Sequence, residues 1–137
     1  DPTNGSTLRT FDCRHAHIDR LAVSPDGQWL VARSRGTLLV WPTTGGMIRR
    51  QKVVCAGQLR NDSLRMFTGM AFHPSGRFLA TTGNDHVVKF WEVGTWRIVE
   101  QFVWQNQRMR SIAFHEDGML AAAGTDDGSL VLWDVDF

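Results

Sequence analysis

The histidines are the side chains in this sequence whose spacing most invites a chemical interpretation. His73 and His115 each precede a glycine turn, in His73-Pro-Ser-Gly76 and His115-Glu-Asp-Gly118, and a histidine near a carboxylate can act as a general base. His15-Ala-His17 puts two imidazoles on one side of an extended segment, which is half of a metal site. No cysteine or carboxylate cluster completes a tetrahedral set, so we predict no metal ligand.

Catalytic signatures are missing from the sequence around these histidines. There is neither a Gly-x-Ser-x-Gly nucleophile motif nor a phosphate-binding glycine loop. His73 and His115 stand where Ser24 stands before another glycine turn, and a residue at a repeated position is more often architectural than catalytic. We therefore predict a non-enzymatic protein with no cofactor. The alternative is a ligand-binding or hydrolytic protein with His73 or His115 at a pocket.

Charge and composition exclude several classes of function. The 137 residues carry 15 basic and 14 acidic side chains, a formal charge of +1 that creates no strong field for nucleic acid or an anionic membrane. With 42% apolar residues the chain can bury a core. It contains no run of 18 apolar residues, which is the length needed to span a bilayer. Two cysteines favour a reducing compartment, and we expect a cytoplasmic location. A start at Asp1, without an initiator methionine or signal peptide, indicates a processed, excised or engineered piece.

The elements that must position these residues are three copies of one pattern. Residues 21–41, 70–91 and 112–133 each read as an apolar run, a glycine turn, a second apolar run and a third run ending in tryptophan. The turn glycines are 49 and 42 positions apart and the tryptophans 50 and 42 apart: Gly27, Gly76 and Gly118; Trp41, Trp91 and Trp133. A period of about 40–50 residues is typical of a four-stranded propeller blade.

The apolar runs predict strands. They are short, rich in Val, Leu, Ile and aromatic residues, and separated by Gly and Asp, and no segment holds a 3.6-residue period. In the turns Ser24-Pro-Asp-Gly27 and His73-Pro-Ser-Gly76, proline presets φ and glycine supplies a positive φ. Thr37–Trp41 is apolar on both faces, as expected for a sheet packed between two others.

The pattern resembles the WD-repeat β-propeller family over nearly the whole chain. The motif residues are Ser24–Gly27, Asp85–Glu92 and Asp127–Asp134. The resemblance implies an all-β fold of four-stranded antiparallel blades within one segment, 1–137. Its expected parts are an outer strand at 7–13, blade 1 at about 17–55, blade 2 at about 66–104 and blade 3 at about 109–137.

Three blades cannot close a ring, because propellers use about four to eight. The chain opens on an outer strand and ends after the third strand of blade 3, so the N-terminal strand is expected to complete a last blade. Further blades of a longer parent chain are the first candidate for closing the ring. Other copies of this chain come next, as a six-bladed homodimer and then a nine-bladed homotrimer.

Asp85 and Asp127 lie six residues before their tryptophans, where an Asp can accept hydrogen bonds from turn N–H groups. The resemblance implies a network of this Asp with a Ser or Thr, a His and the Trp. Ala123 replaces Thr81 in the third copy, so the network is expected to be incomplete there. Trp41, Trp91 and Trp133 are expected in the core, whereas three further tryptophans are expected to be half-buried: Trp29, Trp96 and Trp104.

A basic rim is the predicted recognition surface. In the family that the chain resembles, the loops between an outer strand and the next inner strand lie on the top face, where partners bind. Binding residues are often found on loops that a rigid scaffold positions. The expected rim consists of Arg14, Arg35, Arg60, Arg65 and Arg108. We expect a scaffold that binds a protein or peptide there, and the alternative is a self-assembling structural propeller fragment.

Overall fold

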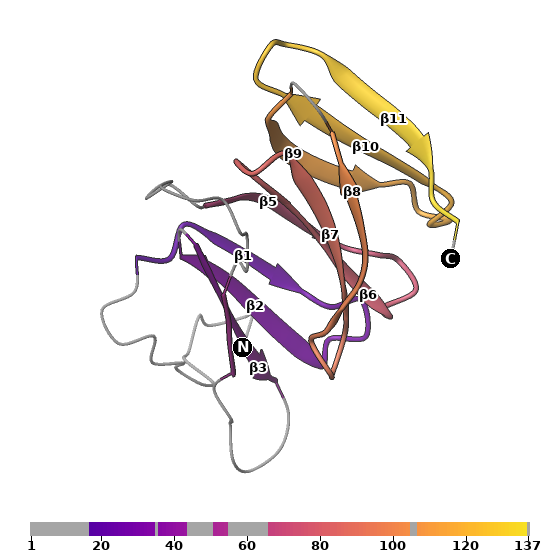
Figure 1. Cartoon of the computed structure of the whole chain (residues 1–137). Helices are drawn as coiled ribbons and strands as arrows, with labels where there is room; N and C mark the ends of the chain where they lie inside the picture. The colour runs from indigo at the N-terminus through magenta and orange to yellow at the C-terminus, as the bar shows by residue number, and fades with distance from the viewer. Residues whose placement is uncertain (1–16, 35, 44–50, 55–65, 105–106, 137) are drawn as a thin grey trace, which may run out of the picture.

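The structure is a computed structural model that describes residues 17–34, 36–43, 51–54, 66–104 and 107–136. Within this part the chain forms eleven strands in three antiparallel sheets, one after another in the sequence. Figure 1 shows the sheet of blade 2 lying between those of blades 1 and 3. The predicted all-β architecture with three WD-type blades is thereby confirmed, and the described residues form no closed ring.

Blades 1 and 2 each have four strands in sequential order, so every connection is a simple hairpin. In blade 1 these are β1 (Arg20–Val23), β2 (Trp29–Ser34), β3 (Thr37–Pro42) and β4 (Gln51–Val54). In blade 2 they are β5 (Phe67–Phe72), β6 (Phe78–Gly83), β7 (Val87–Glu92) and β8 (Ile98–Val103).

Blade 3 has three strands among the described residues. They are β9 (Met109–Phe114), β10 (Leu120–Thr125) and β11 (Leu130–Asp134), in the order β11-β10-β9. In the described part of the chain no fourth strand pairs with β11, whereas β3 and β7 each have an outer partner. The predicted outer strand at 7–13 lies outside the described residues.

The core consists of the seams between blades, because each sheet is apolar on both faces. Leu79 and Trp91 of blade 2 pack against Val31, Leu38 and Val40 of blade 1. Cross-strand partners share a face, and Trp91 is directly opposite Leu79. The tryptophan of blade 2 therefore points back toward blade 1.

The second seam repeats this arrangement one blade further on. The opposite face of blade 2, with Val88 and Phe90, packs against Ile112, Ala123 and Trp133 of blade 3. Trp91 and Trp133 thus each face the preceding blade. Trp41 lies on the corresponding face of blade 1, with Leu39 and Ala32 and away from the first seam.

The hairpin turns between the first two strands of each blade use glycine in the left-handed region. Gly27, Gly76 and Gly118 have φ of 73°, 75° and 77°, where a side chain would be strained. At Gly118 space is also limiting, because an added Cβ would lie 2.5 Å from Cε1 of His73. Gly118 is therefore required by both the turn and the neighbouring blade.

Trp96 differs from the half-buried position expected of it. The side chain is buried, and its ring meets that of Trp29 edge to face at a centroid distance of 5.4 Å. Trp96 has a positive φ of 57°, and its indole packs into the apolar cluster between blades 1 and 2. Trp29 and Trp104 are half-buried as expected. No described segment is a helix long and apolar enough to cross a membrane.

Candidate functional site

We call the end of the blades that carries the β6–β7 and β10–β11 turns the upper end, and the end with the glycine turns the lower end. The upper end of blade 2 contains a buried ion pair. Lys89 Nζ lies 2.8 Å from Asp85 Oδ2, and both side chains are almost fully buried. Asp85 Oδ1 also accepts a hydrogen bond from the N–H of Val87 at 3.2 Å. Gly83 is needed beside it, because a Cβ there would come within 2.7 Å of the same oxygen. Asp85 thus ties its turn to β7, and its acceptor oxygens point inward rather than to a ligand.

Asp127 holds the equivalent turn of blade 3 but is exposed. Its carboxylate accepts hydrogen bonds from the hydroxyl of Thr125, from the N–H of Ser129 at 3.0 Å and from Nε2 of Gln107 at 3.2 Å. The Thr125 hydroxyl and the Ser129 donors hold the pKa of Asp127 below its usual value. This is an Asx-type turn in solvent, and among the residues that the structure describes no lysine or arginine forms an ion pair with it as Lys89 does with Asp85.

The two later tryptophans differ in one hydrogen bond. Trp91 Nε1 donates to Thr81 Oγ1 at 2.9 Å within the core. The Nε1 of Trp133 is buried and has no hydrogen-bond partner among the described residues. Ala121 lies directly opposite Trp133, and Ala123, two residues further along β10, stands where blade 2 has Thr81 and has no side-chain acceptor. Of the polar network implied by the resemblance, blade 2 therefore shows the bond between Thr81 and Trp91, and blade 3 lacks the Thr that would make it.

The upper ends of blades 2 and 3 are joined by polar loops. His86 Nδ1 donates to the carbonyl oxygen of Gln107 at 2.8 Å, and Gln107 in turn reaches Asp127. Next to it, the Arg108 carbonyl accepts a hydrogen bond from the N–H of Asp126 at 3.0 Å. The guanidinium of Arg110 pairs with the Asp126 carboxylate and lowers the pKa of that carboxyl. These loops form an exposed, mixed-charge rim.

Of the five arginines predicted to form a basic rim, the structure places one. Arg108 is exposed at the start of β9, beside the acidic turn of Asp126 and Asp127. The described part of this surface is therefore mixed in charge and not purely basic. The remaining members lie outside the described residues: Arg14, Arg35, Arg60 and Arg65.

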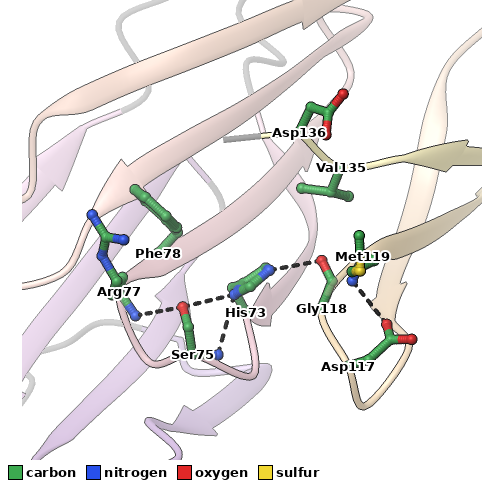
Figure 2. A pocket seen from close by; sticks show the side chains of 9 residues that line it. All are labelled: His73, Ser75, Arg77, Phe78, Asp117, Gly118, Met119, Val135 and Asp136. Atoms are coloured by element: carbon green, nitrogen blue, oxygen red, sulfur yellow. Dashed lines mark hydrogen bonds between the residues drawn. The ribbon is translucent and has the colours of Figure 1, made fainter.

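The lower end of the molecule carries a small pocket at the seam between blades 2 and 3 (Figure 2). It has a volume of about 270 Å³, and His73, Arg77 and Asp117 are among the residues that line it. Arg77 lies over the ring of Phe78, with 5.3 Å between the guanidinium carbon and the ring centroid. His73 is the residue that joins the two blades here.

His73 is locked by structural hydrogen bonds. Its Nε2 lies 2.8 Å from the carbonyl oxygen of Gly118, so Nε2 carries the proton and donates it. Its Nδ1 then accepts from Ser75, from the N–H at 3.1 Å and from the hydroxyl at 2.8 Å. The ring also meets Phe78 and Phe114 edge to face. With both nitrogens engaged, His73 acts as a latch between blades.

His115 occupies the corresponding place in blade 3 and is exposed. Its Nδ1 lies 3.0 Å from Asp117 Oδ1. The described residues contain no group of three His, Cys, Asp or Glu side chains that could hold a metal ion. His17 is exposed, and His15 lies outside the described residues.

Two features of this site escaped the sequence argument. The Asp85–Lys89 pair and the His73–Gly118 latch depend on how strands face one another and on how two blades meet. The repeated His-x-x-Gly spacing marks the position of the latch in the sequence, but it also marks His115, which contacts Asp117 of its own turn. The partner of His73 in the latch is a backbone carbonyl of a glycine 45 residues away, so no side chain in the sequence reveals it.

Comparison with known proteins agrees with this architecture. The chain is 30% identical to Pre-mRNA-processing factor 19 homolog 2 of Arabidopsis thaliana over 128 residues, which cover 92% of this chain and 23% of that protein. It is 25% identical to nuclear distribution protein nudF of Aspergillus niger, covering 98% of this chain and 33% of the relative. It is 28% identical to transducin beta-like protein 2 of Homo sapiens, covering 96% and 30%. The chain therefore spans about a quarter to a third of the length of these relatives.

The family profile described as "WD domain, G-beta repeat" matches residues 5–42, 54–92 and 99–134. Each match is displaced from the sheets by one strand, since the third begins within β8 and ends with β11. The three matches together cover most of the sequence, in register with the turn glycines and tryptophans. The chain belongs to the WD40-repeat family.

Proposed function

We propose that this chain is a protein-interaction scaffold that binds a protein or peptide on the loops at its upper end. WD40 domains are generally non-catalytic and bind proteins. The observation that carries the proposal is the rim in which His86, Gln107 and Asp127 are tied together across two blades. Because the loops are fixed by hydrogen bonds, a partner would lose little entropy in ordering them.

The exposed guanidinium of Arg108 is the contact we expect a partner to use. Arginine can bind a carboxylate through two hydrogen bonds and is common at interface hot spots. We expect the four predicted arginines outside the described residues to extend the same surface. We also propose a cytoplasmic location, because the two cysteines favour a reducing compartment.

A photo-reactive side chain introduced at position 108 tests the proposal. It should cross-link a partner that mass spectrometry identifies, and Arg108→Glu should weaken binding of that partner about tenfold or more. Arg97→Glu is the matched control, because Arg97 is also exposed but lies at the lower end of blade 2. Equal loss of binding in both variants, or a cross-link only from position 97, would overturn the proposal.

The outer face of blade 3 supports a second proposal, that further WD-type blades cover it. Leu130 and Leu132 are 84% and 64% exposed. They correspond to Val88 and Phe90 in blade 2, which are fully buried against blade 3. Exposed apolar patches of this kind usually mark an interface. Blades of a longer parent chain are the first candidate for the cover, then a six-bladed homodimer, then a nine-bladed homotrimer, with residues 7–13 supplying an outer strand for β11.

The molar mass of the chain in solution distinguishes these arrangements. A dimer or trimer that Leu132→Asp dissociates supports closure by copies. A monomer whose stability rises when the adjoining blades are added in cis supports closure within a parent chain. A well-folded monomer that gains nothing from added blades would contradict both.

A further inference from the structure

The lower end of the first seam is filled by a tryptophan side chain. Trp96 is buried in the apolar cluster between blades 1 and 2, and its ring meets that of Trp29 edge to face with 5.4 Å between the centroids. Val93, from the same turn as Trp96, packs against the same cluster. Trp96 lies five residues after Trp91, and no described residue stands at that distance after Trp133. The second seam therefore has no counterpart of this indole among the described residues.

The pocket at the lower end of the second seam has the same two walls as the Trp96 site. Phe78 stands two residues after its turn glycine, as Trp29 does, and it faces blade 3 as Trp29 faces blade 2. Val135 stands two residues after the tryptophan of its blade, as Val93 does. Phe78 and Val135 both line the pocket (Figure 2). The pocket is therefore the position in the second seam that corresponds to the indole of Trp96 in the first.

The backbone holds the two valine walls in the same way. The N–H of Val93 donates to the carbonyl oxygen of Arg77 at 2.9 Å, and the N–H of Val135 donates to that of Met119 at 2.8 Å. Arg77 and Met119 each follow directly after a turn glycine. The pocket has a volume of about 270 Å³, and an apolar cavity of about 150 Å³ already admits benzene. It therefore has room for an aromatic side chain.

The mouth of the pocket is more acidic than the Trp96 site. Asp117 and Asp136 line it from blade 3, where blade 2 has an uncharged serine and glycine at the equivalent positions. The N–H of Met119 donates to Asp117 Oδ1 at 2.8 Å and holds the pKa of that carboxyl below its usual value, so Asp117 is charged at neutral pH. Arg77 lies on the blade 2 side, over the ring of Phe78. The two carboxylates on the blade 3 side favour an occupant that carries a cation beside its aromatic ring.

We propose that this pocket binds a tryptophan side chain in a peptide segment of a partner protein, with a basic residue of that peptide beside Asp117 and Asp136. The chain itself contains the sequence pattern of such a peptide, because Trp96 is followed by Arg97. The indole N–H of Trp96 is buried without a hydrogen-bond partner among the described residues, so a site of this type selects the ring by its shape. The pocket lies at the opposite end of the seam from the rim of the proposed function, and neither site depends on the other.

Fluorescence anisotropy with a labelled peptide tests the proposal. The probe is Gly-Thr-Trp-Arg-Ile, which copies residues 94–98, and the same peptide with alanine in place of tryptophan is its control. We expect saturable binding of one probe peptide per chain, and an affinity about tenfold or more lower for the alanine peptide. Phe78→Leu removes the ring that would meet the indole edge to face, and it should weaken binding about two- to tenfold. Thermal melting checks that this variant folds.

Charge reversal at the mouth tests the basic residue of the peptide. Asp136→Lys should weaken binding of the probe about two- to fivefold, because a favourable charge pair becomes a repulsive one at an exposed site. Asp134→Lys is the matched control. Asp134 is also exposed and lies two residues away, but it does not line the pocket, so the same change of charge there should have little effect.

Trp96→Gly should create a second site for the same peptide. Glycine suits the positive φ of 57° at this position, and loss of the indole opens the equivalent place in the first seam. The stoichiometry should rise from one probe peptide per chain to two. No binding to the wild-type chain, equal binding of the tryptophan and alanine peptides, or indifference to both Phe78→Leu and Asp136→Lys would overturn the proposal. Binding that appears only in Phe137→Ala would assign the pocket to the last side chain of this chain and would overturn it as well.

Discussion

A single hydroxyl distinguishes the tryptophan sites of blades 2 and 3. Thr81 accepts the indole N–H of Trp91, and the equivalent Ala123 leaves the buried N–H of Trp133 without an acceptor among the described residues. Leaving a buried donor unpaired costs about 1–3 kcal/mol. Blade 3 therefore packs its tryptophan on shape alone, at some cost in stability.

Restoring the acceptor should stabilise blade 3. Ala123→Ser adds one hydroxyl at the position where blade 2 has Thr81, and we expect the free energy of unfolding to rise by about 1 kcal/mol. Thr81→Val, which removes the acceptor in blade 2 while preserving shape, should lower it by about 1–3 kcal/mol. Urea denaturation followed by tryptophan fluorescence measures both. A loss of stability in Ala123→Ser would mean that packing at this site leaves no room for the hydroxyl.

The latch makes Gly118 more sensitive than Gly27. Both have a positive φ, for which alanine costs about 1–2 kcal/mol. Only Gly118 also faces a neighbour, the ring of His73, and such overpacking adds about 1–3 kcal/mol. Thermal unfolding should therefore show a larger loss for Gly118→Ala than for Gly27→Ala. In a His73→Ala background the difference should shrink, and additive effects would contradict the contact.

At the scale of the elements, sequence reasoning was most successful where a strand is short and apolar. Thr37–Trp41 and Val87–Trp91 were recognisable because apolar residues occupy both faces between turn residues. Side-chain pairing was harder, because it depends on the facing strand. Lys89 lies in an apolar run, and nothing in its neighbours reveals that the turn of Asp85 folds back over it. The burial of Trp96 followed from a positive φ that sequence does not reveal in a residue other than glycine.

The ion pair between Asp19, directly before β1, and Arg33 of β2 predicts that this part of blade 1 is sensitive to acid. Asp19 Oδ1 lies 2.8 Å from Arg33 Nε, and this hydrogen bond lowers the pKa of the Asp19 carboxyl. A carboxyl with a lowered pKa stabilises the fold above its unfolded value of about 3.9, and this contribution disappears as pH falls through the folded value. The free energy of unfolding should therefore decline below about pH 5.

Asp19→Asn should flatten part of that decline. Urea denaturation at a series of pH values measures the effect, which should be modest because the carboxylate is half exposed. Arg33→Gln should flatten the same part, since it removes the cation. Unchanged curves would show that other carboxyls dominate the acid response. Among those with lowered pKa are Asp26, Asp117, Asp126 and Asp127.

At the scale of the whole molecule, blade 2 packs against a neighbouring blade on both faces, whereas blades 1 and 3 each do so on one face among the described residues. Every residue of β6 is buried, whereas three of the five residues of β11 are exposed. Different hydrogen bonds cross the two seams. The Arg33 guanidinium donates to the Thr68 carbonyl oxygen at the first seam, and His73 donates to the Gly118 carbonyl oxygen at the second. Stability should therefore be unevenly distributed along the chain.

Native-state hydrogen exchange measures that distribution. Amides of β6 and β7 should exchange most slowly, because they open only with the whole fold. Amides of β11 should exchange faster, because one edge and one face of this strand are uncovered among the described residues. His73→Ala should speed exchange in β9 and β10 more than in β1 and β2. Uniform protection across the three blades would argue against local opening.

The backward-facing tryptophan gives the array a direction. Each repeat brings an indole for the repeat before it and an apolar wall for the repeat after it, so one unit of about 40–50 residues contains both sides of a seam. Duplicating such a unit inserts a ready-made joint at both of its ends. Blade number can therefore change in evolution, or by design, in whole steps and without the invention of any new contact.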